Sequence, residues 1–299
     1  MPHVHHGVME SGGFPVLLFL TIAFVALAYV RGWIRLRSIA PNSVPAWRGG
    51  SFLLGLSLIW VAVASPVAAL DHELLTVHMI QHLLLMSLAP ALIWLGLPVM
   101  PLWQGLPQGF VQRVISPVFG SPPVQQLGRL LAQPAFGWLA ATAVLVGWHV
   151  PAAFMLAVKS GTWHLIEHAS FLVAGLLFWW PVIQPWPSGP RWPEWSILLY
   201  LFLATLPCDI LSAFLVFCDR VVYPIYFSSS RLLGFSALGD QQCAGALMWT
   251  SVTIIYLLAG TIFTIRLLST QGSREDGLVQ PESSLNAAQL KDPRRVEAA

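Results

Sequence analysis

Charged side chains are scarce in this sequence. Asp, Glu, Lys and Arg make up 9% of the 299 residues, whereas a soluble domain usually carries about 25%. Apolar residues make up 56% of the chain and its mean hydropathy is +0.70. This composition excludes an ordinary soluble domain and predicts a protein of the lipid bilayer. The net charge of +2 gives no reason to expect a nucleic-acid partner.

Lysine and cysteine are also rare. The lysines, Lys159 and Lys291, lie outside the apolar runs, which excludes a retinal protein because the Schiff base needs a lysine inside the bundle. Cys208, Cys218 and Cys243 show no CxxC spacing. We expect buried, inert thiols, with a disulfide between Cys218 and Cys243 as the alternative.

Seven apolar runs have lengths near the roughly twenty residues that span a bilayer. They are residues 14–30, 51–69, 78–97, 135–150, 164–183, 195–217 and 241–267. The first is not expected to be a signal peptide, because its basic cluster of Arg31, Arg35 and Arg37 follows it. The predicted fold is an all-α, polytopic bundle of seven transmembrane helices over residues 1–269. Residues 270–299 are polar and charged, which indicates a disordered cytoplasmic tail.

The basic residues predict the orientation of the bundle. With the N-terminus outside, twelve of the 15 Lys and Arg residues fall on the inner side, and only Lys159, Arg220 and Arg231 fall outside. Inner loops of membrane proteins carry this excess of positive charge. We therefore expect the N-terminus outside and the C-terminus inside.

All nine histidines fall on the outer side of this topology, which suggests a metal or cofactor site at that face. They are His3, His5 and His6 in the N-terminal segment, His72, His78 and His82 around the third run, His149 at the end of the fourth, and His164 and His168 at the start of the fifth. The N-terminal three fit a solvated tail as well as a metal-gathering segment.

The spacing of four of these histidines favours a site. His78 and His82, like His164 and His168, are four residues apart and share one helical face. A single interfacial histidine is more often a packing residue, but polar groups inside spans usually mark function. The predicted metal ligands are His72, His78, His82, His149, His164, His168, Asp240 and Met86. Glu167 lies beside His168 and adds a carboxylate at the same depth.

Copper agrees with these residue types. Imidazole binds copper, zinc and iron, whereas thioether sulfur favours Cu(I). Met86 lies four residues after His82 on the same face, and Met79 and Met248 are nearby. Each methionine has packing or lipid contact as its alternative role.

Pro207, Cys208 and Asp209 interrupt the sixth run near its middle. Proline frees a backbone carbonyl, and an aspartate inside the membrane needs a partner. The interruption marks an ion or proton route, or else an internally bonded kink.

Several motifs resemble the CtaG family of cytochrome c oxidase assembly factors. The most specific is HMIQHLLLM at residues 78–86, followed by Ala89-Pro90 and LGLP at residues 95–98. Supporting matches are Trp148-His149, Trp163-His164 through Glu167-His168, FWWP at residues 178–181, and Asp240-Gln241-Gln242 through Ala244-Gly245 to Met248-Trp249. Together they cover the third to seventh runs, about two-thirds of the chain.

The resemblance implies a seven-span protein of the bacterial inner membrane that is needed to build haem–copper oxidase and supplies copper. We therefore expect a non-catalytic assembly factor that binds copper at its outer face, with oxidase subunits and a periplasmic copper donor as partners. Two alternatives remain open. The histidines could ligate haem b in an electron carrier, or they could make hydrogen bonds in a scaffold without metal.

Overall fold

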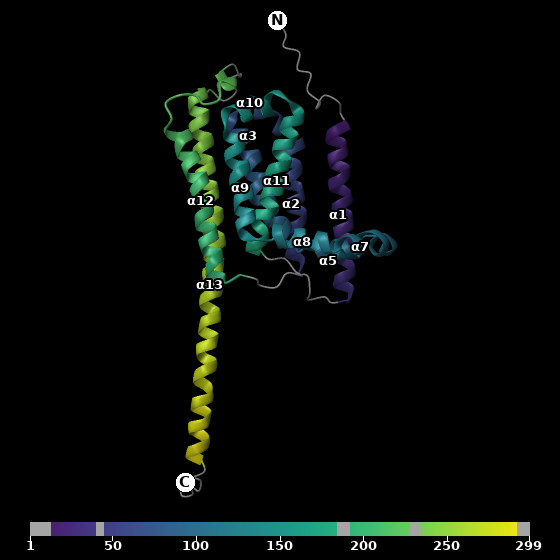
Figure 1. Ribbon diagram of the computed structural model, residues 1–299, viewed down its shortest axis with the longest axis vertical. Coiled ribbons are helices and arrows are strands. Elements are labelled where there is room, and N and C mark those ends of the chain that lie inside the picture. Colours follow the sequence, from purple (N-terminus) through teal and green to yellow (C-terminus); the bar gives the residue numbers. More distant parts are fainter. Residues whose placement is uncertain (1–12, 40–44, 184–191, 228–233, 235, 292–299) are drawn as a thin grey trace.

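The computed structural model describes residues 13–39, 45–183, 192–227, 234 and 236–291, and Figure 1 shows their arrangement. Every regular element in these ranges is a helix, and they contain no strand. The predicted all-helical class is therefore confirmed. His3, His5 and His6 lie outside the described residues.

The elements follow one another as a series of long helices joined by short helical segments. They are α1 (Gly13–Ile39), α2 (Ala46–Ala64), η2 (Ala68–His72), α3 (Leu75–Leu83), η3 (Leu84–Leu88), α4 (Ala89–Leu95), α5 (Val99–Gly105), α6 (Gln108–Phe110), η4 (Val111–Ile115), α7 (Ser116–Gly120), α8 (Pro122–Leu131), α9 (Pro134–His149), α10 (Pro151–Lys159), α11 (Gly161–Ile183), α12 (Glu194–Phe217), η5 (Pro224–Phe227) and α13 (Ala237–Lys291).

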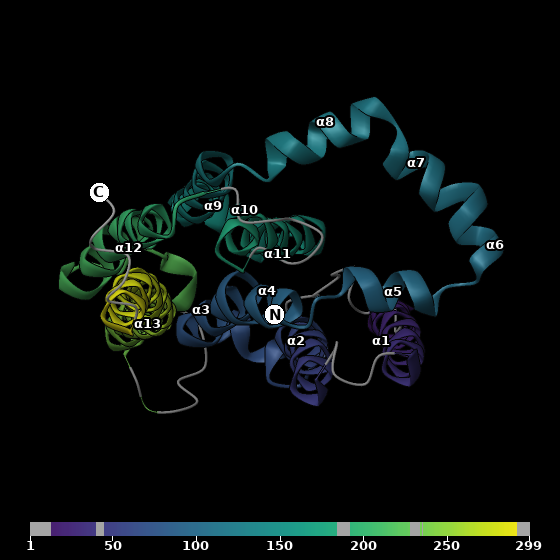
Figure 2. The same ribbon diagram turned by 90° about the horizontal axis from the view of Figure 1, so that it is seen from below.

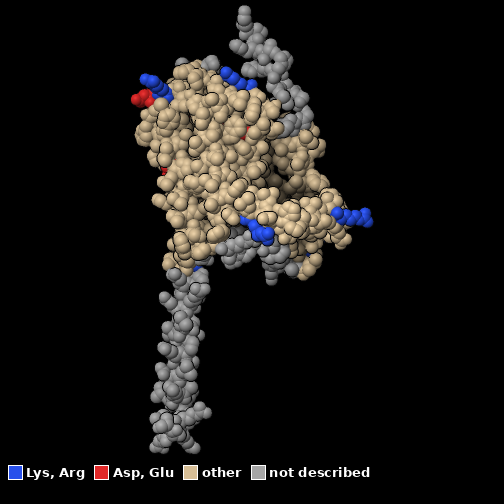
Figure 3. All heavy atoms as spheres, viewed as in Figure 1, with Lys and Arg blue, Asp and Glu red and all other residues tan. Residues whose placement is uncertain are grey.

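In the part of the chain that the structure describes, six helices are long and apolar enough to cross a membrane, against the seven that we expected. A seventh span exists if α8 and α9, which meet at a bend of 68°, are counted together. Helix α9 has only 16 residues. The surface agrees with a lipid environment, because large apolar side chains such as Leu27, Phe202 and Ile210 are exposed. In Figure 3 the visible face of the bundle carries few charged side chains between its two ends.

The helices form a bundle with one peripheral member. Figure 2 shows α12 beside α13 and α9 beside α11, while α1 stands at one edge. Helices α5 to α8 form an arc around one side of the molecule, at the end opposite α10. We call the end that carries α10 the α10 end of the bundle. Residues 109–115 lie in α6 and η4 of this arc.

The third span, Leu75–Leu95, is a single helical stretch of 21 residues made of α3, η3 and α4. Its middle, η3, is a π-helical turn, a feature that often accompanies functional sites. Pro90 follows and has no N–H to donate to the carbonyl of Met86, four residues earlier. Gly175 of α11 packs here, since a Cβ atom on it would lie 2.4 Å from Met86 O and 2.7 Å from Pro90 Cγ. This glycine allows the backbones of the third span and α11 to approach closely.

Two further predictions concern the C-terminal half. Helix α13 continues past position 269 to Lys291, and the domain boundary proposed there stays a prediction. Cys208, Cys218 and Cys243 are free thiols, but only Cys208 is buried and Cys243 is exposed.

Candidate metal centre

Five buried histidines gather at the α10 end of the bundle. The third span supplies His78 and His82, α9 ends at His149, and α11 supplies His164 and His168. Each is at most 5% exposed. The structure therefore brings together, beneath the surface, histidines that are separated by up to ninety positions in the chain.

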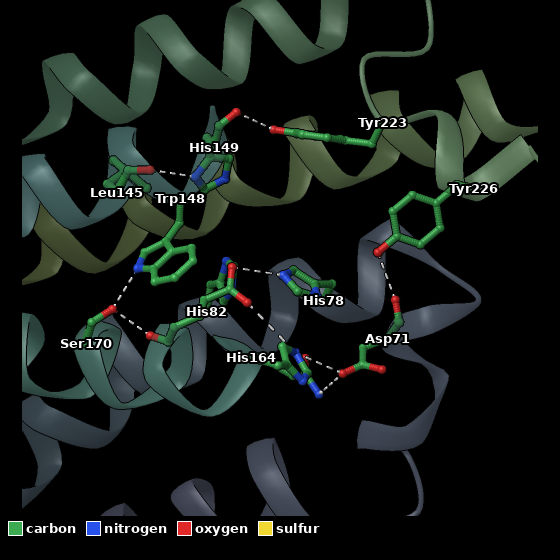
Figure 4. Close-up of polar contacts among 12 residues, drawn as sticks. Asp71, His78, His82, Leu145, Trp148, His149, His164, Ser170, Tyr223 and Tyr226 are labelled. Carbon is green, nitrogen blue, oxygen red and sulfur yellow. Dashed lines mark hydrogen bonds and ion pairs between the residues drawn. The ribbon is translucent and has the colours of Figure 1, made fainter. Parts of the chain in front are cut away.

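The two helical pairs lie close together, and Figure 4 shows three of their members, His78, His82 and His164, near one another. Ring centroids lie 4.4 Å apart in the pair His78–His82 and 4.2 Å apart in the pair His164–His168. Between the helices, His78 and His164 are stacked with centroids 5.5 Å apart. Consecutive turns of α3 and α11 thus present four imidazoles to a common space.

Glu167 is the acidic residue of this space. Its side chain has no exposed surface. Oε1 lies 3.5 Å from His78 Nε2 and 3.4 Å from His82 Nε2, and Oε2 lies 3.9 Å from His164 Nε2. Its backbone carbonyl accepts a hydrogen bond from Ser170 Oγ, which in turn accepts one from Trp148 Nε1. Glu167 follows His164 by three positions, so both lie on the inward face of α11.

Asp71 adds a second carboxylate from the 3₁₀ segment η2. Its Oδ2 lies 3.3 Å from His164 Nε2 and accepts a hydrogen bond of 3.2 Å from Gln81 Nε2. Tyr226 Oη donates to the Asp71 backbone carbonyl at 2.8 Å. These contacts place the carboxylate at the edge of the histidine cluster.

Many polar atoms of the cluster are buried and have no hydrogen-bond partner. They are Asp71 Oδ1, His78 Nε2, His82 Nδ1 and Nε2, His149 Nε2, His164 Nε2, His168 Nε2, and Glu167 Oε1 and Oε2. Buried polar groups in proteins are almost always paired, so such a concentration is typical of a site that holds an ion or ordered water. Three groups have ligand atoms within 4.8 Å of one another, namely Asp71/His78/His164, His78/His82/Glu167 and His164/Glu167/His168. These residues fit a metal ion.

His149 presents a defined lone pair. Its Nδ1 lies 2.7 Å from the carbonyl oxygen of Leu145. A carbonyl oxygen only accepts, so Nδ1 carries the hydrogen and the neutral ring keeps a lone pair on Nε2. That tautomer is the one in which a histidine binds metal through Nε2. The His149 ring is 6.0 Å from that of His82 but belongs to none of the three groups.

Aromatic side chains cover the cluster. Phe154 of α10 lies with its centroid 4.9 Å from that of His78 and stacks on Tyr223 at 4.0 Å. Tyr223 Oη donates to the His149 carbonyl at 2.9 Å. Burial raises the pKa of Tyr223 and of Tyr226 well above the usual value, so both stay neutral hydrogen-bond donors. The cover excludes bulk water from the centre.

The remaining predicted ligands lie around this centre. The His72 side chain is 48% exposed, with Nε2 3.6 Å from Asp71 Oδ1, and lies at the rim. Met86 lines an apolar pocket toward the middle of the bundle, together with His82, His149, Met79, Met248 and Cys208. Asp240 lies outside the three groups, because its carboxylate binds the first residues of α3.

The interruption expected at Pro207, Cys208 and Asp209 is not found, because α12 is one continuous helix over Glu194–Phe217. Pro207 lies inside the helix, and Cys208 contacts Ser212 Oγ at 3.8 Å. Oδ1 of Asp209 is buried without a partner.

Two acidic residues of the centre are absent from the predicted ligands. Glu167 was noted only as a neighbour of His168, although its spacing of three from His164 is visible in the sequence. Asp71 lies in an irregular segment whose direction no periodicity reveals. The only available signal was an aspartate beside His72 at the edge of an apolar run.

Comparisons with known proteins agree with the motifs. The family model of the cytochrome c oxidase caa3 assembly factor matches residues 27–270. Uncharacterized proteins of Mycobacterium bovis and Mycobacterium leprae are 26% and 24% identical over 88% of this chain. The chain spans only 39% and 40% of their lengths. No solved structure matches the chain. Because the family model covers most of the sequence, the chain belongs to the cytochrome c oxidase caa3 assembly factor family.

Proposed function

We propose that this protein binds copper at the centre formed by Asp71, Glu167 and the buried histidines, and supplies it during assembly of a haem–copper cytochrome c oxidase. Its role is non-catalytic, with oxidase subunits as acceptor and a periplasmic protein as donor. Membership of the assembly-factor family supports the oxidase part. The copper part rests on the chemistry of the centre.

The observation that carries the proposal is the set of buried, unpartnered nitrogen and oxygen atoms that face one another. A scaffold that used these histidines only for hydrogen bonds would pair them. Instead, the nearest neighbours of Glu167 are imidazoles at 3.4 and 3.5 Å, which is longer than a hydrogen bond in good geometry. Ligand atoms that surround a metal ion have this spacing.

The same spacing argues against haem b. A porphyrin between α3 and α11 needs an open slot, whereas the Glu167 carboxylate lies between the two imidazole pairs. Phe171 stacks on His82 at 4.0 Å and closes another side. The centre therefore favours a bare ion.

The distribution of basic residues supports a position of this centre at the outer face of a bacterial inner membrane. Of the Lys and Arg residues, only Lys159, Arg220 and Arg231 fall on the side of the histidines. Half-exposed His72 at the rim then faces the periplasm and forms the entry for copper.

Metal analysis of the purified full-length protein tests the proposal. The wild type and a His78→Ala/His82→Ala variant are loaded with copper in detergent, desalted and analysed for bound copper, with an absorption spectrum of each. Phe171→Leu is the control, because it removes the ring stacked on His82 without removing a ligand atom. We expect copper in the wild type and control, and much less in the double variant. Equal copper in all three proteins, or a Soret band, contradicts the proposal.

A further inference from the structure

Glu167 divides the histidine cluster into two halves. Its Oε1 faces the pair on α3, with His78 and His82 at 3.5 and 3.4 Å. Its Oε2 faces α11, with His164 Nε2 at 3.9 Å. His168 completes this second half, since its ligand atom lies within 4.8 Å of those of His164 and Glu167. The halves share Glu167 and no histidine.

Each half has the dimensions of a separate ion site. Imidazole and carboxylate ligands lie about 2.0–2.2 Å from a bound ion, so ligands of one ion are about 3–4 Å apart. The separations on the α3 side fall in this range. A carboxylate that offers one oxygen to each of two ions holds them about 3.5–4 Å apart. Among the described residues, two of the three ligand groups combine Glu167 with one histidine pair each, and the third, Asp71/His78/His164, joins the halves at their edge.

Charge balance bears on the oxidation state of the ions. Asp71 and Glu167 are buried carboxylates, and none of their ion pairs in the described part of the chain involves Lys or Arg. The nearby carboxylate of Asp240 is stabilised by the N–H groups at the start of α3. Uncompensated buried charge is strongly unfavourable. Two charges therefore remain to be balanced, by one divalent ion or by two monovalent ions, and the two oxygens of Glu167 with a histidine pair at each favour the two monovalent ions.

We infer that the centre is binuclear and holds two Cu(I) ions, one bound by His78 and His82, the other by His164 and His168, with Glu167 as the bridge. This inference rests on the proposed copper function and specifies its stoichiometry and oxidation state. Asp71 lies at the side of the centre nearer His72 and supplies the second negative charge. Neither carboxylate is left uncompensated when both ions are bound.

An anaerobic Cu(I) titration of the full-length protein against a coloured Cu(I) chelator tests this stoichiometry. We expect two tightly bound ions per wild-type chain. His78→Ala/His82→Ala and His164→Ala/His168→Ala should each bind one ion, because each removes one half. The quadruple variant should bind none. Size-exclusion chromatography checks that each variant is folded, and Phe171→Leu, expected to bind two ions, controls for altered packing.

The wild-type count decides the inference without reliance on any variant. One ion per chain, lost completely in either double variant, establishes a mononuclear centre and overturns the inference while leaving the copper function intact. No Cu(I) bound to the wild type overturns both. Two ions that persist in both double variants place the copper elsewhere and also contradict the inference.

Discussion

Asp240 and Thr76 join the start of α13 to the start of α3. Asp240 Oδ1 accepts a hydrogen bond of 2.6 Å from Thr76 Oγ1, and its Oδ2 accepts one of 2.6 Å from the backbone N–H of Leu75. The carboxylate thus caps the helix that carries His78 and His82. Asp240 positions the third span through its first turn.

Loss of this cap should destabilise the fold without removing a copper ligand. Asp240→Ala leaves two N–H groups of α3 unpaired, and we expect a loss of about 1–3 kcal/mol in unfolding free energy. Thermal unfolding in detergent measures the effect, with exposed Asp219→Ala as the control for loss of an acid. The folded fraction should bind copper as the wild type does. Loss of copper from folded protein would show that Asp240 is itself a ligand.

Gly175 should tolerate no side chain. An alanine Cβ would lie 2.4 Å from the carbonyl oxygen of Met86, so the third span and α11 must separate. We expect Gly175→Ala to cost about 1–3 kcal/mol, as overpacking does, and to reduce bound copper because the two histidine pairs move apart. Gly147→Ala is the matched control, since no atom lies within 4 Å of its Cβ position. Equal melting temperatures of the two variants would contradict the close packing.

His72 should affect the rate of copper loading more than its amount. Its side chain is 48% exposed and lies beside Asp71 at the rim, outside the three ligand groups. In stopped-flow loading, we expect His72→Ala to take up copper several-fold more slowly and to reach the wild-type content. A lower final content would make His72 a ligand of the centre.

The orientation is testable with a reporter enzyme fused after Ala299. The excess of Lys and Arg on one side predicts a cytoplasmic C-terminus. A reporter that works only in the cytoplasm should therefore be active, and one that works only in the periplasm should be silent. The reverse pattern would move the histidine cluster to the inner face.

The sequence predicts the local features of this fold well. Apolar runs of nearly twenty residues form helices in the structure. Inside a bilayer the backbone N–H and C=O groups must hydrogen-bond to one another, and a helix satisfies all of them. The spacing of four within His78–His82 and His164–His168 placed each pair on one face, and the structure turns these faces toward each other. Periodicity specifies such relations because they lie within one helix.

Relations between elements are harder to predict. Asp240 has the right depth for the centre, but its lateral position depends on how α13 packs against α3. Asp71 lies in η2, and hydrogen bonds from Gln81 and Tyr226 hold it beside the histidine cluster. Helix α9 is shorter than a typical span. The bend between α8 and α9 cannot be predicted from hydropathy, which reports how apolar a segment is but not its direction.

The copper content of the oxidase in living cells tests the central claim most directly. Cells that carry His82→Ala/His168→Ala should keep the protein in the membrane, yet assemble oxidase with less copper and lower activity. Added external copper should partly restore both, because mass action refills or bypasses a weakened site. Oxidase with normal copper and activity in the variant strain, without added copper, would contradict the role of these histidines in copper supply.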